Sequence, residues 1–220
     1  MRWYYKAYFS RYIRSLTILQ FKVVDSQYAL GNGLSNTSFK KGNGFGISTY
    51  LTTSYSRNSV AVSDESIQEY FQINRRLSLL TQEDNTVMVS QIAENNVMQN
   101  YIEVGFKNLN LAILDNCTVE YEFLKEFFQV NENQLELRGI IEQIFQHTFN
   151  EALEYTKQLV QYTYDIFGVL ISIRVAQQLQ FESRRRNMPV IEDYLNGQLM
   201  ILWPKFQQLV DFQCDSLRRV

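Results

Sequence analysis

The side chains that could carry out chemistry in this chain are few and widely spaced. Cys117 and the single histidine, His147, could in principle act as a nucleophile and its general base. However, Cys117 falls on an apolar stripe with Ile113 and Tyr121 at helical spacing, which favours a buried core residue over a catalytic thiolate. One histidine also excludes any site that needs two imidazoles. We therefore predict no catalytic residues and no enzymatic activity.

Metal and cofactor sites are not indicated either. Between residues 120 and 154, eight glutamates accompany only two basic residues, and carboxylates in a helical bundle can bind metal. The usual companion, a histidine three residues after a glutamate, is missing because Glu142 and His147 are five apart. A solvated or partner-facing acidic surface is the better interpretation. The glycine-rich run Gly42–Gly46 lacks the Gly-Lys-Ser/Thr of a phosphate-binding loop, which favours a flexible linker. We predict no metal and no cofactor.

The charge of the chain is balanced overall but divided unevenly along its length. The 220 residues carry a net charge of -2, which argues against a dedicated nucleic-acid-binding protein. Residues 1–60 hold eight basic side chains and one acidic side chain, whereas residues 61–220 hold 13 basic and 22 acidic ones. We therefore expect the N-terminal part to face an acidic surface, either on its own fold or on a partner.

The cysteines and the hydropathy pattern predict a cytosolic protein. Two cysteines that stand 97 positions apart cannot form a disulfide framework and suit a reducing compartment. The longest apolar stretch, residues 166–173, has eight residues, whereas a membrane span needs about 20. No secretory signal is expected, because the basic residues of the first 25 positions interrupt any apolar core.

Helical periodicity dominates the pattern of apolar residues. Residues 1–25 predict an amphipathic helix with a narrow apolar stripe, and residues 97–220 predict a helical bundle with helices at about 97–130, 134–182 and 190–220. Gly139 and Gly168 are candidate kinks in the second of these helices, and Pro204 is expected to kink or restart the third. The first helix is expected to pack against the 134–181 helix. Its stripe consists of Tyr5, Phe9, Tyr12, Leu16, Leu19 and Val23.

Two segments interrupt this helical pattern. Residues 26–63 are rich in glycine, serine and asparagine and predict a long flexible insertion. Residues 64–96 contain short apolar clusters with polar breaks and predict irregular or extended chain laid over the helices. The fold class expected from the whole pattern is all-α: an elongated helical bundle with a long flexible insertion.

Three further features each allow two interpretations. The basic residues of the first helix, including Arg2, Lys6, Arg11 and Arg14, could contact an anionic membrane, but the narrow stripe favours packing against another helix. The run Arg184–Arg186 could contact lipid or phosphate, although a solvated helix end is the simpler interpretation.

The third feature is the pair Trp203 and Pro204, which is more typical of a packed kink than of a ligand site. From the residues alone, two rivals to an interaction scaffold stay open. One is a peripheral membrane-binding module that uses the first helix, and the other is a helical enzyme, for which no constellation of residues is found.

Several blocks of sequence resemble one family. The resemblance to the vacuolar protein sorting-associated protein 52 (Sac2) family covers essentially the whole chain, in matching order and spacing. Its most specific parts are the Leu-Asp-Asn-Cys and Leu-Trp-Pro-Lys-Phe blocks. The blocks are residues 4–11, residues 112–117 with Glu120, Tyr121 and 126–128, Arg185, Arg186, Met188, Pro189, Asp193 and Tyr194, and residues 202–206.

The resemblance implies a non-enzymatic role in vesicle tethering. Members of this family are subunits of the Golgi-associated retrograde protein (GARP) complex, a tether of the helical-rod type that captures endosome-derived carriers at the trans-Golgi network. The implied partners are the other GARP subunits, the related endosomal recycling complex, a Golgi Rab-type GTPase and SNARE proteins. The implied location is the cytosolic face of the trans-Golgi network and endosomes, with peripheral membrane association. Family members are considerably longer, so we expect this chain to be a middle portion of one. The resemblance assigns no partner-binding residue.

Overall fold

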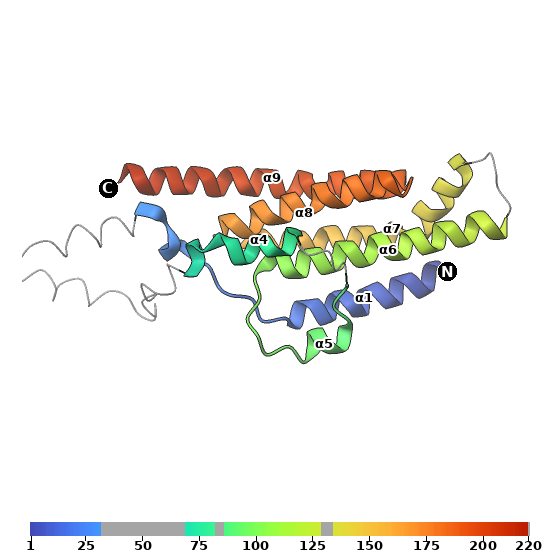
Figure 1. Ribbon diagram of the computed structural model, residues 1–220, viewed down its shortest axis with the longest axis horizontal. Helices are drawn as coiled ribbons and strands as arrows, with labels where there is room; N and C mark the ends of the chain where they lie inside the picture. Colours follow the sequence, from blue (N-terminus) through green and yellow to red (C-terminus); the bar gives the residue numbers. More distant parts are fainter. Residues whose placement is uncertain (32–68, 82–85, 129–133, 220) are drawn as a thin grey trace, which may run out of the picture.

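The described part of the chain is a bundle of α-helices that lie along one long axis (Figure 1). The computed structural model describes residues 1–31, 69–81, 86–128 and 134–219. Within these residues the helices confirm the predicted all-α class. The helices are α1 (Arg2–Ile18), α4 (Ile73–Thr81), α5 (Ser90–Glu94), α6 (Ile102–Phe127), α7 (Gln134–Gln161), α8 (Ile166–Arg185) and α9 (Pro189–Arg218). The predicted insertion at 26–63 lies, from residue 32 onward, outside the described residues.

Helix α6 is the central element of the bundle. It packs against α1, α7 and α8. The residues of its predicted stripe from Ile102 to Cys117, including Phe106 and Ile113, are buried, whereas Phe128 at the end of the stripe is 56% exposed. Residues off that stripe, such as Leu111 and Leu114, are buried as well, because α8 covers a second side of the helix. Gly105 allows Tyr155 of α7 to approach the backbone of α6 closely, since a Cβ at position 105 would lie 2.5 Å from the Tyr155 hydroxyl. The core therefore surrounds α6 instead of lying along one face of it.

Helix α1 packs through its apolar stripe, as predicted. The side chains of Tyr5, Phe9 and Leu16 are buried, and α1 lies against α7, α6 and α5. The hydroxyl of Tyr5 donates a 2.8 Å hydrogen bond to Glu120 on α6. The expectation that α1 packs against the 134–181 region is confirmed through α7. The predicted extension of the stripe to Val23 is wrong, because the helix ends at Ile18 and Val23 is 82% exposed.

The predicted single helix at 134–182 is two helices. Helix α7 ends at Gln161, and α8 begins at Ile166 and runs back in the opposite direction (Figure 1). The break forms at polar side chains that bond to backbone amides in place of helical carbonyls. The carboxylate of Asp165 accepts from the Gly168 amide at 2.9 Å, and the Thr163 hydroxyl accepts from the Asp165 amide at 3.1 Å. Gly168 is therefore part of the first turn of α8, not a kink.

The segment predicted to be irregular, 64–96, contains two short helices in its described part. Helices α4 and α5 have nine and five residues, which is too short for stability in isolation. Tertiary contacts stabilise each of them. Ala93 of α5 is buried near α1, where Ser15 donates a 2.7 Å hydrogen bond to Glu94, and Arg76 of α4 is buried among carboxylates. The local pattern could not reveal partners so distant in sequence.

The turn between α8 and α9 is closed by backbone bonds. Asn187 adopts a positive φ of 54°, its amide bonds to the Arg184 carbonyl at 3.0 Å, and the Met188 amide bonds to the Ser183 carbonyl at 2.9 Å. These bonds form a Schellman motif, in which asparagine tolerates the left-handed conformation. Helix α9 then continues through Pro204, so the expected restart there does not occur.

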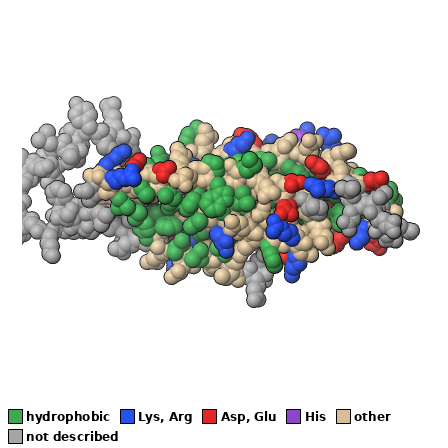
Figure 2. Space-filling view, turned by 90° about the horizontal axis from the view of Figure 1, so that it is seen from above, with side chains coloured by type: hydrophobic (Ala, Val, Ile, Leu, Met, Phe, Trp, Pro, Cys, Tyr) green, Lys and Arg blue, Asp and Glu red, His purple; other side chains and the backbone are tan. Residues whose placement is uncertain are grey.

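The outer face of α9 is partly apolar. Seen from that side (Figure 2), hydrophobic side chains gather over the half of the molecule where the C-terminal part of α9 lies, and charged side chains gather mainly over the other half. Met200 and Trp203 are among the exposed apolar residues of this helix. Trp203 is 46% exposed, so the expected packed kink at Trp203 and Pro204 is only partly buried.

The buried stripe of α1 makes a direct prediction about stability. Changing Phe9 or Leu16 to Asp places an unpaired carboxylate in the core and is expected to reduce the free energy of unfolding by about 3–5 kcal/mol. Urea unfolding followed by circular dichroism measures this effect. Ile18→Asp is the matched control, because Ile18 is on the same helix and is 56% exposed. Equal unfolding midpoints for Leu16→Asp and Ile18→Asp would contradict the packing role of α1.

Candidate functional site

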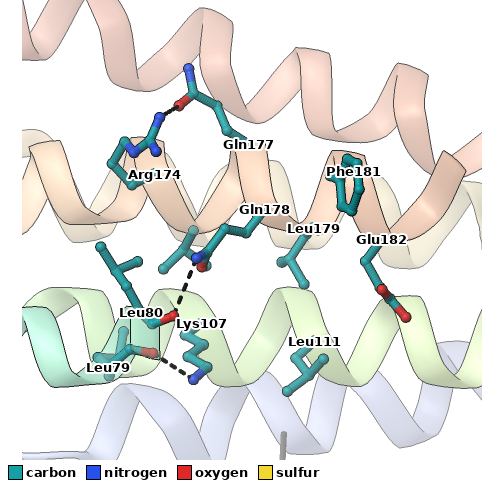
Figure 3. Close-up of a pocket in the computed structure, with 11 residues that line it drawn as sticks. Leu79, Leu80, Lys107, Leu111, Arg174, Gln177, Gln178, Leu179, Phe181 and Glu182 are labelled. Carbon is teal, nitrogen blue, oxygen red and sulfur yellow. Dashed lines mark hydrogen bonds between the residues drawn. The ribbon is translucent and has the colours of Figure 1, made fainter. Parts of the chain in front are cut away.

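A groove of about 440 Å³ opens between α4, α6 and α8. Its apolar lining includes Leu111 of α6 and Leu179 of α8, both buried at its floor, and Phe181 of α8, whose side chain is 71% exposed. Lys107, Arg174 and Glu182 supply its charges. Figure 3 shows these residues around the end of α4. We take this groove as the candidate site for binding another protein.

Helix α4 occupies one part of the groove and ends inside it. The Leu79 carbonyl accepts a 2.8 Å hydrogen bond from the Lys107 ammonium, and the Leu80 carbonyl accepts one of 3.2 Å from the Gln178 amide (Figure 3). These donors satisfy carbonyls that have no partner within the helix. Beyond Leu80, the lining residues come from α6 and α8 alone. The described residues therefore leave this end of the groove uncovered.

The charges in the groove are unevenly satisfied. Glu182 accepts hydrogen bonds from Arg185 and Arg186, and these bonds, with some opposition from burial, lower the pKa of Glu182. Lys107 and Arg174, in contrast, form no ion pair within the described residues: Lys107 bonds to the Leu79 carbonyl and Arg174 to the Gln177 amide oxygen. Burial lowers the pKa of Lys107. A carboxylate from outside would complement these two cations.

A buried ion cluster places α4 in this position. The guanidinium of Arg76 bonds to both carboxylate oxygens of Glu103 at 2.7 and 2.8 Å, and to both of Asp165 at 3.0 and 2.7 Å. Each of the three side chains is at most 3% exposed. The ring of Tyr101 lies 3.8 Å from the guanidinium carbon. The cluster connects α4 to the first turn of α6 and to the residue that caps α8.

The electrostatics of the cluster follow from its burial. Desolvation raises the pKa of Glu103, although the Arg76 guanidinium acts in the opposite direction. For Arg76, desolvation opposes the charged form, but the hydrogen bonds that its guanidinium donates to Glu103 and Asp165 more than offset this effect and raise the pKa of Arg76. Two carboxylates share one cation, so the cluster relies on the geometry of its four hydrogen bonds.

Gly168 is required beside the cluster. A Cβ at this position would lie 2.6 Å from the Asp165 carboxylate, 2.7 Å from Ile102 and 2.9 Å from the Arg76 guanidinium. Such distances force atoms of the cluster to move. Glycine is therefore needed here because α8, α6 and the ion cluster pack closely together. Its φ is not positive, so the backbone conformation alone does not require glycine.

The structure does not support the candidate chemistry drawn from the sequence. Cys117 is fully buried, and burial raises the pKa of its thiol well above the usual value, so it is a core residue. His147 contacts a carboxylate: its Nδ1 atom lies 3.6 Å from a carboxylate oxygen of Glu151. The run Gly42–Gly46 lies outside the described residues.

The acidic residues at 120–154 do not converge on one point. Glu120 accepts from Tyr5 and Glu151 from Ser10, both on α1, while Glu142 and Glu154 are exposed on α7. Among the described residues, no three potential metal ligands lie close enough together to bind an ion. Two of these glutamates therefore bond to hydroxyl groups of α1, whereas the basic side chains of α1 form no ion pair with them among the described residues. The expected pairing of the basic N-terminal charges with an acidic surface of the same fold is not seen for this helix.

The run Arg184–Arg186 is engaged in ion pairs. Arg184 pairs with Glu192, Arg185 with Glu182, and Arg186 with both Glu182 and Asp115. These pairs join the end of α8 to α9 and to α6. The side chains of Arg184 and Arg185 are 64% and 70% exposed, which agrees with the simpler interpretation of a solvated helix end.

Sequence reasoning missed the groove and the ion cluster. Arg76 stands 27 positions from Glu103 and 89 from Asp165, so no local pattern connects them. Only Asp165 carried a signal, because an aspartate before an apolar run is typical of a helix N-cap.

Comparisons with known proteins cover the whole chain. A family model described as "Vps52, C-terminal" matches residues 1–220. Vacuolar protein sorting-associated protein 52 of Saccharomyces cerevisiae is 67% identical over 227 residues, which cover 100% of this chain and 35% of that protein. The protein of the same name in Schizosaccharomyces pombe is 33% identical over 54% of this chain and 23% of its own length.

A more distant relative extends the match to animals. The human vacuolar protein sorting-associated protein 52 homolog is 24% identical over 97% of this chain and 27% of its own length. The chain therefore spans about a third or less of the length of these relatives. No solved structure matches it. Among the described helices, none is both long and apolar enough to cross a membrane.

The ion cluster predicts a large cost for removing its cation. Arg76→Met leaves two buried carboxylates without a counter-charge and is expected to reduce the free energy of unfolding by about 3–5 kcal/mol. Arg75→Met is the matched control, because Arg75 is the exposed neighbour and its replacement is expected to cost less than about 0.5 kcal/mol. Urea unfolding at neutral pH measures both.

The same variant has an expected pH dependence. The pKa of Glu103 is already raised by burial in the wild type. Without the guanidinium, the pKa of Glu103 in the folded state rises further. Protonation of Glu103 then favours the folded state, so the loss of stability in Arg76→Met is largest at pH values above this pKa. Lowering the pH towards about 5 is therefore expected to narrow the stability gap between Arg76→Met and wild type. A gap that is constant from neutral to acidic pH would contradict the cluster as the cause.

Proposed function

Since this chain belongs to the Vps52 family, we propose that it is a non-enzymatic subunit of the GARP vesicle-tethering complex. It would act in retrograde transport from endosomes to the cytosolic face of the trans-Golgi network. The observation that carries the proposal is the family match over residues 1–220, together with the 67% identical yeast relative. The partners we propose are the other GARP subunits, the endosomal recycling complex, a Golgi Rab-type GTPase and SNARE proteins.

The fold suits a spacer that binds proteins. The long helices α6, α7, α8 and α9 lie along one axis, so they supply length and continuous side surfaces (Figure 1). Apolar contacts around α6 and the ion cluster at one end of α4 make this spacer stiff. Stiffness matters for a tether because it sets the distance between the groups that it holds.

The groove is the surface that we propose for a sister subunit. Its occupant would be an amphipathic α-helix, with apolar side chains over Leu111, Leu179 and Phe181. The groove already accepts such an element, because α4 lies in its other part through Leu79 and Leu80. An acidic side chain on the incoming helix would face Lys107 and Arg174, whose charges no described carboxylate balances. Helix-in-groove recognition commonly combines these elements.

Affinity capture tests both parts of this proposal. The tagged chain is expected to recover GARP subunits from yeast cytosol. A groove variant that combines Arg174→Glu and Phe181→Asp is expected to recover at least tenfold less of the subunit that binds there, because it reverses one charge and makes the apolar wall polar. Both side chains are exposed, so the fold should be retained, and circular dichroism verifies this.

The matched control is Ile92→Asp on α5. Ile92 is 58% exposed and lies outside the groove, so this variant is expected to recover the subunits as wild type does. Failure of the wild-type chain to recover any GARP subunit would overturn the proposed function. Equal recovery by the groove variant and the wild type would leave the function standing and remove the groove as its binding site.

A further inference from the structure

The outward face of α1 combines exposed aromatic residues with basic ones. Because the apolar stripe of this helix is buried in the bundle, the opposite side faces solvent. Trp3 is 80% exposed, Tyr4 58% and Tyr8 43%, and Ile18 extends the apolar character to the last turn at 56%. Helix α1 lies along one long edge of the bundle, where α5 flanks it (Figure 1).

The cations of α1 lack counter-charges within the described structure. Arg2, Lys6, Arg11 and Arg14 are all exposed, the helix contains no acidic residue, and none of the four forms an ion pair in the part of the chain described here. This contrasts with Arg184–Arg186, each of which pairs with a carboxylate. The outward face of α1 thus carries four positive charges that have no ion-pair partner among the described residues.

The acidic groups that lie near α1 bond to its hydroxyl groups and form no ion pair with its cations among the described residues. Glu151 on α7 accepts a 2.6 Å hydrogen bond from Ser10, and Glu94 on α5 accepts one of 2.7 Å from Ser15. Glu120 accepts from Tyr5 at the buried side. These hydrogen bonds hold α1 with its apolar stripe towards the bundle, and the four cations remain exposed to solvent.

We propose that this face of α1 binds the surface of an anionic phospholipid bilayer. Basic side chains near such a surface are attracted by its negative potential, and Trp and Tyr side chains prefer the boundary between headgroups and acyl chains. An acidic protein would satisfy the charges alone, whereas the exposed Trp3, Tyr4 and Tyr8 add a chemistry that suits an interface of water and lipid. The buried stripe remains in the bundle, so α1 rests on the bilayer without inserting its apolar side.

This inference extends beyond the proposed function, because it needs no partner subunit. It concerns a different surface from the groove and a different kind of ligand. If both are correct, one chain would contact a bilayer through α1 and a protein through the groove between α6 and α8.

Vesicle flotation with the purified chain tests the inference. Binding to vesicles of phosphatidylcholine and phosphatidylserine is expected, weakening as salt is added, with little binding to phosphatidylcholine alone. Replacing Arg2, Lys6, Arg11 and Arg14 together by Gln is expected to reduce partitioning by about 100-fold or more, since each cation contributes roughly fivefold. Trp3→Ala, tested separately, is expected to weaken binding without changing its salt dependence.

A matched variant separates position from overall charge. Replacing Arg75, Lys125, Arg218 and Arg219 by Gln removes the same number of exposed cations from other parts of the chain and is expected to retain binding within about tenfold. Circular dichroism confirms that both variants fold. The inference is overturned if the wild type does not float with anionic vesicles, if the α1 variant floats as well as wild type, or if the matched variant loses as much binding. Because no tether subunit is present, these outcomes are independent of the capture experiment.

Discussion

A single buried guanidinium connects three parts of this fold that are distant in sequence. Arg76 bonds to Glu103 at the start of α6 and to Asp165 at the cap of α8, so α4 lies across the beginning of both helices. The same carboxylate that receives Arg76 also ends the chain reversal between α7 and α8. Charged groups this deeply buried persist only when each is paired and hydrogen-bonded. The position of α4, and with it the groove beside α4, follows from this cluster.

Two kinds of interaction stabilise the bundle in different ways. Apolar burial around α6 supplies the driving force for folding, but it is not directional, because packed apolar side chains tolerate small shifts of one helix relative to another. Hydrogen bonds at the helix ends supply direction: the cluster at Arg76, the cap at Asp165, and the Schellman turn at Asn187. A stiff spacer needs both, since burial without directional bonds would allow helices to slide along one another.

The surfaces left over by this packing differ in chemistry. Where α4 ends, the groove between α6 and α8 is apolar with two unpaired cations, which suits a helix with an acidic side chain. The outward face of α1 is aromatic and basic, and suits an anionic bilayer. The sequence also shows a run of three arginines at the end of α8, but in the structure each of them forms an ion pair, so we do not count this run among the candidate binding surfaces. Unpaired charge, more than charge itself, distinguishes the candidate binding surfaces.

The sequence by itself determined the helical class, the approximate span of α6 and α9, the inward stripe of α1 and the core role of Cys117. These features depend on residues three or four positions apart, which the local pattern records. Only the tertiary structure decided the break at Tyr162–Asp165, the helices α4 and α5, and the groove. Each of these depends on partners dozens of positions away: Arg76 on Asp165, Glu94 on Ser15, and Lys107 on the Leu79 carbonyl. Periodicity carries no information about such pairs, because their free energy appears only once the helices are packed.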